Sequence, residues 1–199
     1  FYITEYNNTM KGMNVGERIL ASLFSATTAR TAGFNSVDTG SLTSASKLLT
    51  CVLMFIGGSP GSTAGGIKTT TIFILVVSLW SGITDRHKTA VFKRRFEDDA
   101  IKKASTVFTL NMFLAIFALF TILAITDLSL SDVMFEVFSA IGTVGMTTGI
   151  TRDLSSAARI IIMVLMFCGR VGSLSFALTF LQGKKDPPVY YPEEEISVG

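Results

Sequence analysis

Charged residues are scarce in this sequence. Asp, Glu, Lys and Arg make up 16% of the 199 residues, whereas a soluble domain usually contains about 25%. Hydrophobic residues make up 49% and are concentrated in blocks, one of which runs from Thr106 to Ile125 without a charge. About 20 such residues are enough to span a bilayer. The composition therefore argues against a soluble fold and predicts an all-α integral membrane protein.

Residues that bind metals or form disulfides are also rare. The chain contains 2 cysteines and 1 histidine, and Cys51 and Cys168 stand singly in apolar segments, so we expect neither a disulfide nor a protein-bound metal. No paired acids or nucleophile–base set lie within the apolar blocks, which argues against an intramembrane enzyme and a cofactor. Phe1–Lys11 lacks the features of a signal peptide and reads like the end of a helix, so we expect further membrane segments upstream.

Basic residues gather in two hydrophilic segments, a linker at 84–104 and a tail at 184–199. The positive-inside rule places both in the cytoplasm, so the chain is expected to cross the cell membrane several times. Nucleic-acid binding is the alternative use of such a patch, but the position beside membrane segments already accounts for the charge. The residues are Arg86, His87, Lys88, Lys93, Arg94, Arg95, Lys102, Lys103, Lys184 and Lys185.

Two parts of the chain repeat each other. Leu42–Gly57 and Leu154–Gly169 share eight of sixteen residues at an offset of 112, and the same offset aligns Thr31–Phe34 with Thr143–Met146. A chance resemblance between apolar helices does not explain an offset that is shared by a loop and a helix. We therefore predict two tandem units of one plan.

Each unit is expected to contain a membrane helix, a half-helix too short to span, a loop, and a helix that returns to the inside. Because linker and tail are both cytoplasmic, the half-helix and loop must dip in from the outer side, where irregular backbone is tolerated only if protein buries it or water lines it. This is the plan of a pore loop. The first unit is expected at 1–83, without its opening helix; its half-helix and filter lie at 17–36 and its broken returning helix at 47–83. The second unit is expected at 105–183, with its half-helix at 133–141 and its filter at 142–149. The linker at 84–104 joins the two units, and the tail occupies 184–199.

The loops contain the tetrads TAGF and TVGM, which we predict to be a potassium filter. Such a filter replaces the water around the ion with rings of backbone carbonyl oxygens, and glycine belongs at the tight position because the conformation disfavours a Cβ. One T-x-G triplet is weak evidence, but two at matched positions after half-helices are strong, and the half-helix dipoles favour a cation. Potassium is expected at Thr31, Ala32, Gly33, Phe34, Thr143, Val144, Gly145 and Met146.

A glycine-rich segment, 57–66, interrupts the returning helix of the first unit. It resembles a phosphate-binding loop, but Ile67 separates Gly66 from Lys68 and breaks the required motif. A simple helix break is the second alternative. We favour an irregular intramembrane loop that begins about 15 Å below the start of its helix and acts as a gate, since unsatisfied backbone in lipid is too costly. The predicted gate comprises Gly57, Gly58, Ser59, Pro60, Gly61, Ser62, Thr63, Ala64, Gly65, Gly66 and Arg170.

Arg170 interrupts the last apolar block, roughly 22 Å below the start of its helix. An arginine inside a membrane costs at least about 2.5 kcal/mol and usually faces a cavity or a partner. Two compatible roles are a partner for the carbonyls of the 57–66 loop and a direct barrier to cation leak. Both predict that Arg170→Ala changes ion flux without abolishing expression.

These motifs resemble those of the Ktr/Trk/HKT superfamily of potassium transporters. The resemblance rests on Thr28–Ser36, Gly57–Lys68, Gly142–Gly149 and Phe167–Ser173, and the ending Tyr191–Gly199 is similar to that of bacterial Ktr membrane subunits. It implies tandem helix–pore-loop–helix repeats, four in one chain with pseudo-fourfold symmetry, of which these units would be the third and fourth. Because a closed filter needs four loops, the upstream half of the same polypeptide would supply the other two.

The resemblance further implies a homodimer with one pore per subunit and a cytoplasmic ring of nucleotide-binding regulatory subunits. Gly33 and Gly145 would be filter glycines and Arg170 the arginine beside the gating loop. Potassium is the expected substrate and sodium a further candidate. The main alternative is a secondary transporter with re-entrant hairpins and a midplane cation or substrate site, which favours inverted repeats, whereas these units run in the same orientation. A non-conducting membrane subunit would have no use for duplicated T-x-G loops.

Overall fold

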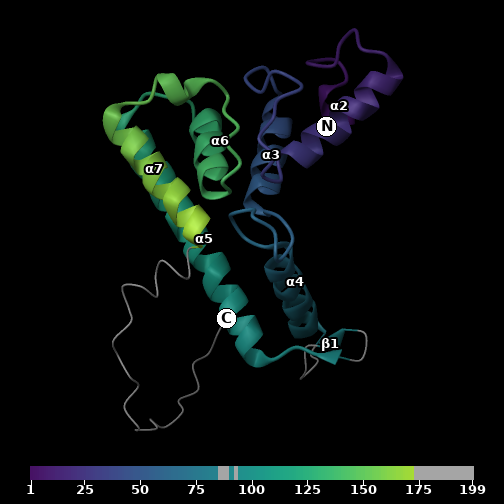
Figure 1. The fold of residues 1–199 in the computed structure, drawn as a ribbon, viewed down its shortest axis with the longest axis vertical. Coiled ribbons are helices and arrows are strands. Elements are labelled where there is room, and N and C mark those ends of the chain that lie inside the picture. Colours follow the sequence, from purple (N-terminus) through teal and green to yellow (C-terminus); the bar gives the residue numbers. More distant parts are fainter. Residues whose placement is uncertain (85–89, 92–93, 173–199) are drawn as a thin grey trace.

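The computed structural model describes residues 1–84, 90–91 and 94–172; the remaining residues, including His87 and the whole predicted tail, lie outside that part. The prediction of an all-α fold is confirmed (Figure 1). Besides helices, the described residues contain one short antiparallel pair in the linker, β1 (Ala90–Val91) with β2 (Arg94–Arg95). The helices are α1 (Tyr2–Glu5), α2 (Val15–Thr28), α3 (Ser44–Phe55), α4 (Thr69–Ile83), α5 (Asp98–Ile125), α6 (Leu130–Ile141), the short 3-10 helix η1 (Ile150–Arg152) and α7 (Ser156–Val171).

The helices begin at residues that favour capping. Asn14 and Glu17 form a capping box at the start of α2, with the Asn14 amide donating to Glu17 Oε2 at 2.8 Å. Thr43 caps α3 by accepting the Ser46 amide, and Ser155 caps α7 in the same way. Thr43 and Ser155 are equivalent at the offset of 112, so the repeat extends to the signals that start the returning helices.

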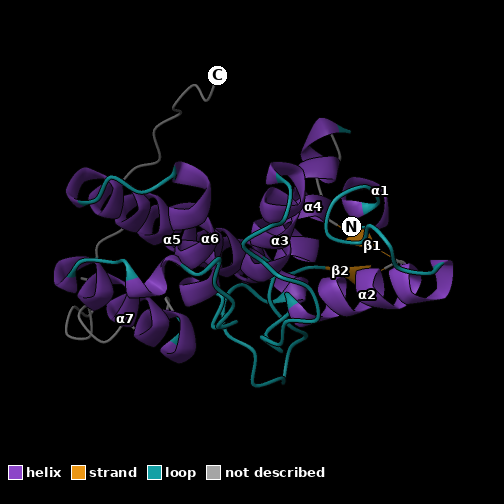
Figure 2. Cartoon of the chain, turned by 90° about the horizontal axis from the view of Figure 1, so that it is seen from above, coloured by secondary structure: helices purple, strands orange, loops and turns teal. Residues whose placement is uncertain are grey.

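The half-helix α6 lies at the centre of the structure. It packs against α3 of the first unit and against α5 and α7 of its own unit, as the side and top views show (Figures 1 and 2). The 28 residues of α5 correspond to about 42 Å. Among the described helices α5 alone is long and apolar enough to cross a membrane, and α3 and α4 are shorter apolar helices. Residues 56–68 connect α3 to α4, so the chain is not helical at the glycine-rich segment.

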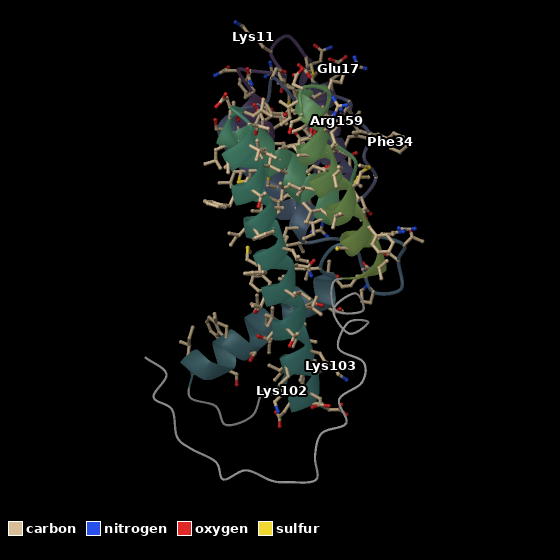
Figure 3. All side chains as sticks on the ribbon, turned by 90° about the vertical axis from the view of Figure 1, so that its left-hand side faces the viewer. Lys11, Glu17, Phe34, Lys102, Lys103 and Arg159 are labelled. Atoms are coloured by element: carbon tan, nitrogen blue, oxygen red, sulfur yellow. The ribbon has the colours of Figure 1, made fainter. Side chains whose placement is uncertain are left out.

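Charged side chains mark the two ends of the long axis. Lys11, Glu17 and Arg159 lie near one end, and Lys102 and Lys103 lie near the other (Figure 3). Between these ends α5 presents large exposed apolar side chains, namely Phe113, Ile116, Phe117 and Phe120. An apolar belt between two charged ends is the surface that a bilayer requires.

Candidate functional site

The two predicted filters follow α2 and α6 directly. Their amides turn back and bond the last carbonyls of each half-helix. The Thr28 carbonyl accepts the amides of Ala32 and Gly33, both at 3.1 Å, and the Val144 amide donates to the Ser139 carbonyl at 2.9 Å. These bonds satisfy carbonyls that a helix end leaves free, and they fix each loop against the end of its half-helix.

The two loops share an unusual backbone conformation. Thr31 and Gly33 have φ of +71° and +76°, and the equivalent Thr143 and Gly145 have φ of +55° and +84°. Positive φ suits glycine but costs other residues about 1–3 kcal/mol, and such strain concentrates at functional sites. In an ordinary extended chain, the side chains and the carbonyl groups of successive residues point to opposite sides. Alternating the sign of φ brings neighbouring carbonyls toward the same side.

The carbonyl oxygens at the start of both tetrads are free to act as ligands. In the second loop, the side chains of Val144 and Met146 are buried against Met54 of α3 and Phe135 of α6, which leaves the backbone to face the other way. Phe34, the counterpart of Met146, is 70% exposed. Within the described residues, no hydrogen bond reaches the main-chain oxygens of Thr31, Ala32, Gly33, Thr143, Val144 and Gly145.

The structure brings the two predicted filters into contact. A Cβ at Gly33 would overlap the Val144 carbonyl, so glycine is required there for close approach as well as for its φ. Beyond the tetrads, the buried Thr39 donates its hydroxyl hydrogen to the Thr147 carbonyl. Two segments 112 residues apart in the sequence thus form one cluster.

Each loop is also held by a side chain of its own half-helix, and the two units use different residues. The Thr28 hydroxyl donates to the Phe34 carbonyl at 2.6 Å and accepts the Phe34 amide at 2.8 Å. In the second unit, Glu136 accepts hydrogen bonds from the hydroxyls of Thr147 and Thr151. Neither Glu136 nor Thr151 was predicted to be a site residue. Glu136 could have been recognised from the sequence as a single acidic residue inside an apolar half-helix.

The predicted gating loop lies against the second filter. Its ends are paired, since the Gly57 amide donates to the Ile67 carbonyl at 2.8 Å. Near its C-terminal end, the buried Gly65 donates its amide hydrogen to Thr143 Oγ1 at 3.0 Å. A Cβ at Gly65 would overlap the Thr143 side chain and approach the Gly169 carbonyl of α7. The loop therefore packs between the filter and α7.

Two cationic side chains bind successive carbonyls of this loop. Arg170 donates from Nη1 to the Thr63 carbonyl, as expected for a partner of the loop. Lys68 donates from Nζ to the Ser62 carbonyl at 3.2 Å and to the Ala64 carbonyl. Hydrogen bonds from charged donors are roughly twice as strong as neutral ones. Lys68 was not predicted to belong to the gate, because its contact with the loop depends on how the loop folds.

A groove of about 900 Å³ runs along the second unit. The predicted filter tetrad Thr143–Met146 and the following Thr147 line it together with Met163 and Met166 of α7, and Arg170 lines it as well. The predicted filter and the arginine of the predicted gate therefore face one open space.

Comparison with known proteins places the chain among cation transporters. The family described as TrkH, cation transport protein, matches residues 1–186. The chain is 36% identical over 200 residues to the Ktr system potassium uptake protein B of Bacillus subtilis, covering 100% of this chain and 45% of that protein. It is 37% identical over 207 residues to the potassium/sodium uptake protein NtpJ of Enterococcus hirae, covering 100% and 46%. The chain thus spans less than half the length of these curated relatives.

A solved structure shares the fold. The crystal structure of the potassium transporter TrkH from Vibrio parahaemolyticus matches with a TM-score of 0.70 at 19% identity, over 92% of this chain and 40% of that chain. The overall arrangement of the helices is therefore that of a known fold.

Proposed function

The chain belongs to the TrkH family of cation transport proteins, and from this premise we propose that it forms two pore repeats of a potassium transporter. The two relatives named above are potassium or potassium/sodium uptake proteins. In the proposed pore, the carbonyls of Thr31–Gly33 and Thr143–Gly145 replace water around the ion, and the rest of the polypeptide supplies the loops that close the ring. Sodium is the second candidate cation.

The repeated backbone conformation carries this proposal. At matched positions both loops have a threonine and a glycine at positive φ. The amides of Ala32, Gly33, Thr143 and Val144 are bonded to the half-helices, whereas the carbonyls of Thr31–Gly33 and Thr143–Gly145 accept no hydrogen bond in the described part of the chain. In a loop that only connects two helices, threonines would not be expected to adopt a strained positive φ, and the carbonyls would be expected to accept hydrogen bonds. The C-terminal ends of α2 and α6 add a negative potential that favours a cation.

The 57–66 loop is the proposed gate below the filter. Arg170 and Lys68 hold three of its carbonyls, and Thr143 holds Gly65. Opening requires that the loop leave these partners. The positive charge of Arg170 raises the barrier for a cation as long as the loop keeps it in place, because like charges repel.

The proposed protein acts in the plasma membrane, with its linker and tail in the cytoplasm. It forms a homodimer, and a ring of nucleotide-binding regulatory subunits docks on the inner face. The name of the Bacillus relative refers to a Ktr system, which supports an assembly of several components. The basic linker is the segment of this chain through which such a ring would be bound.

Uptake of rubidium, a substitute for potassium, into vesicles that contain the purified full-length protein tests the proposed function. We expect uptake that potassium inhibits far more strongly than sodium does. Gly145→Ala should abolish it, because a side chain at φ +84° is strained. The control is Gly16→Ala on α2, where a Cβ meets no atom within 4 Å. Absence of uptake by the wild type, or full uptake by Gly145→Ala, would reject the proposal.

A further inference from the structure

Glu136 is a buried acidic residue of α6 that holds the chain just beyond the second filter. Only 6% of the surface of this residue is accessible to solvent. Its Oε1 atom accepts hydrogen bonds from the hydroxyls of Thr147 and Thr151, the latter at 2.7 Å. The Thr147 hydroxyl also lies 2.8 Å from that of Thr151 and accepts the Gly149 amide at 2.9 Å. One carboxyl group therefore organises the turn that leads out of the filter.

The same network reaches the segment that follows the first filter loop. The Thr147 carbonyl accepts the hydroxyl of Thr39 from the first unit, while the Thr147 hydroxyl binds Glu136. Thr147 follows the tetrad directly, so its position determines where Gly145 and Met146 can lie. Thr147 thus connects Glu136 both to the second filter loop and to the segment that follows the first.

The first unit has no counterpart of Glu136. Aligning Phe24–Ala26 with Phe138–Ala140 places Ser22 at the position of Glu136. The Ser22 hydroxyl lies 3.6 Å from the Met10 sulfur and does not bind the first filter loop.

The first unit instead uses Thr28, which binds both backbone groups of Phe34. The same alignment places Gly142 at the position of Thr28, and glycine has no side chain with which to hold a loop. The second filter loop therefore lacks the Thr28 type of contact and has the Glu136 contact in its place. In both repeats a side chain of the half-helix therefore holds the filter loop, in addition to the backbone hydrogen bonds.

We propose that Glu136 is a positioning residue that sets the geometry of the second filter loop and, through it, the ion selectivity of the pore. This inference rests on the proposed function. A filter of carbonyl oxygens selects ions by the number and placement of those oxygens. Releasing Thr147 and Thr151 allows the carbonyls of Val144 and Gly145 to adapt to an ion of another size, so that discrimination falls while conduction continues.

The test uses purified full-length protein in vesicles and measures the ratio of potassium to sodium permeability from ion-gradient potentials. Glu136→Met keeps the length of the side chain but removes the acceptor, and it should lower the ratio about tenfold, as loss of a hydrogen bond of roughly 1.4 kcal/mol implies. Glu136→Gln keeps one acceptor oxygen and should retain most of the selectivity. Thr151→Val removes a donor from the other side of the same bond and should shift the ratio in the same direction.

The double variant with Glu136→Met and Thr151→Val should be no less selective than Glu136→Met alone, since both changes break the same bond. Ser22→Ala is the matched control in the first unit and should leave the ratio unchanged. An unchanged ratio in both Glu136→Met and Thr151→Val, with only the amount of folded protein reduced, would overturn the inference, and Thr151→Val decides the matter if Glu136→Met does not fold. A wild type that carries no rubidium would instead reject the proposed function, and the inference with it.

Discussion

The hydroxyl of Thr143 accepts the amide of Gly65 at 3.0 Å, so a residue of the second predicted filter directly holds the predicted gating loop of the first unit. α3 begins at Ser44, so the rise along the helix places Gly57, the start of this loop, about 20 Å below the start of α3. The loop nevertheless reaches the filter, because its ends pair at Gly57 and Ile67 while residues near Gly65 fold toward α6. Filter and gate are therefore neighbours that share a hydrogen bond.

Thr143→Val tests this shared bond. Valine keeps the branched shape but leaves the Gly65 amide without an acceptor, which costs about 1–3 kcal/mol for a buried group. The held position of the loop is destabilised by that amount, so we expect the rate of rubidium uptake by the full-length protein to rise severalfold. Thr143→Ser retains the hydroxyl and should behave like the wild type. Equal rates for the valine and serine variants would contradict the role of the bond.

Arg170→Ala should also raise the uptake rate severalfold while the protein remains expressed. The substitution removes the charged donor to the Thr63 carbonyl, a bond worth about 1.5–3 kcal/mol, and it removes a positive charge beside the groove. Arg170→Lys keeps the charge without the planar donor geometry and should give an intermediate rate. Uptake assays normalised to purified protein provide the measurement. Unchanged uptake in Arg170→Ala would show that the arginine has no influence on the gate.

The two repeats could be predicted from the sequence because short local sequence patterns mark them. The offset of 112 located both tetrads, and the glycine-rich segment located the break between α3 and α4. The start of α6 was placed at Val133, whereas the helix begins at Leu130. The apolar run alone defined that prediction, while Ser129, which caps the helix by accepting the Asp132 amide, carries the signal for the true start.

The contacts that hold the site were not predictable, because they join segments that only the fold brings together. Thr39 binds Thr147 across 108 positions and Lys47 binds Asp132 across 85. Positive φ at the two filter threonines also escaped prediction, since threonine normally disfavours it and no local pattern marks the exception.

Gly65→Ala should displace the gating loop. An added Cβ would overlap the Thr143 side chain and lie 2.9 Å from the Gly169 carbonyl oxygen. Neither neighbour can accommodate it without a shift. We expect a loss of thermal stability of about 1–3 kcal/mol together with altered uptake. Gly82→Ala near the end of α4, where nothing lies within 4 Å of an added Cβ, should be neutral or slightly stabilising. Similar melting temperatures for the two variants would exclude tight packing at Gly65.

Asp132 and Lys47 form an ion pair of 2.8 Å between α6 and α3, and its contribution should depend on pH. Partial burial raises the pKa of Asp132, but hydrogen bonds from Lys47 and Ser129 and the charge of Lys47 outweigh burial, so the pKa lies below its ordinary value of 3.8. The stabilisation is therefore fully present above about pH 4 and is lost as the pH falls through the lowered pKa.

Asp132→Asn removes this pH-dependent term. At pH 7 it should cost about 1 kcal/mol, as expected for a pair near the surface, and lower the melting temperature of the detergent-solubilised protein by a few degrees. The difference from the wild type should shrink steadily below pH 4, because the wild-type carboxyl group then becomes protonated as well. Asp127, in the link between α5 and α6, is exposed and forms no ion pair in the described part of the chain, so Asp127→Asn should have no effect at either pH. A melting difference for Asp132→Asn that stays constant from pH 7 to pH 3 would mean that the pair contributes nothing and that the asparagine acts only through the cap of α6.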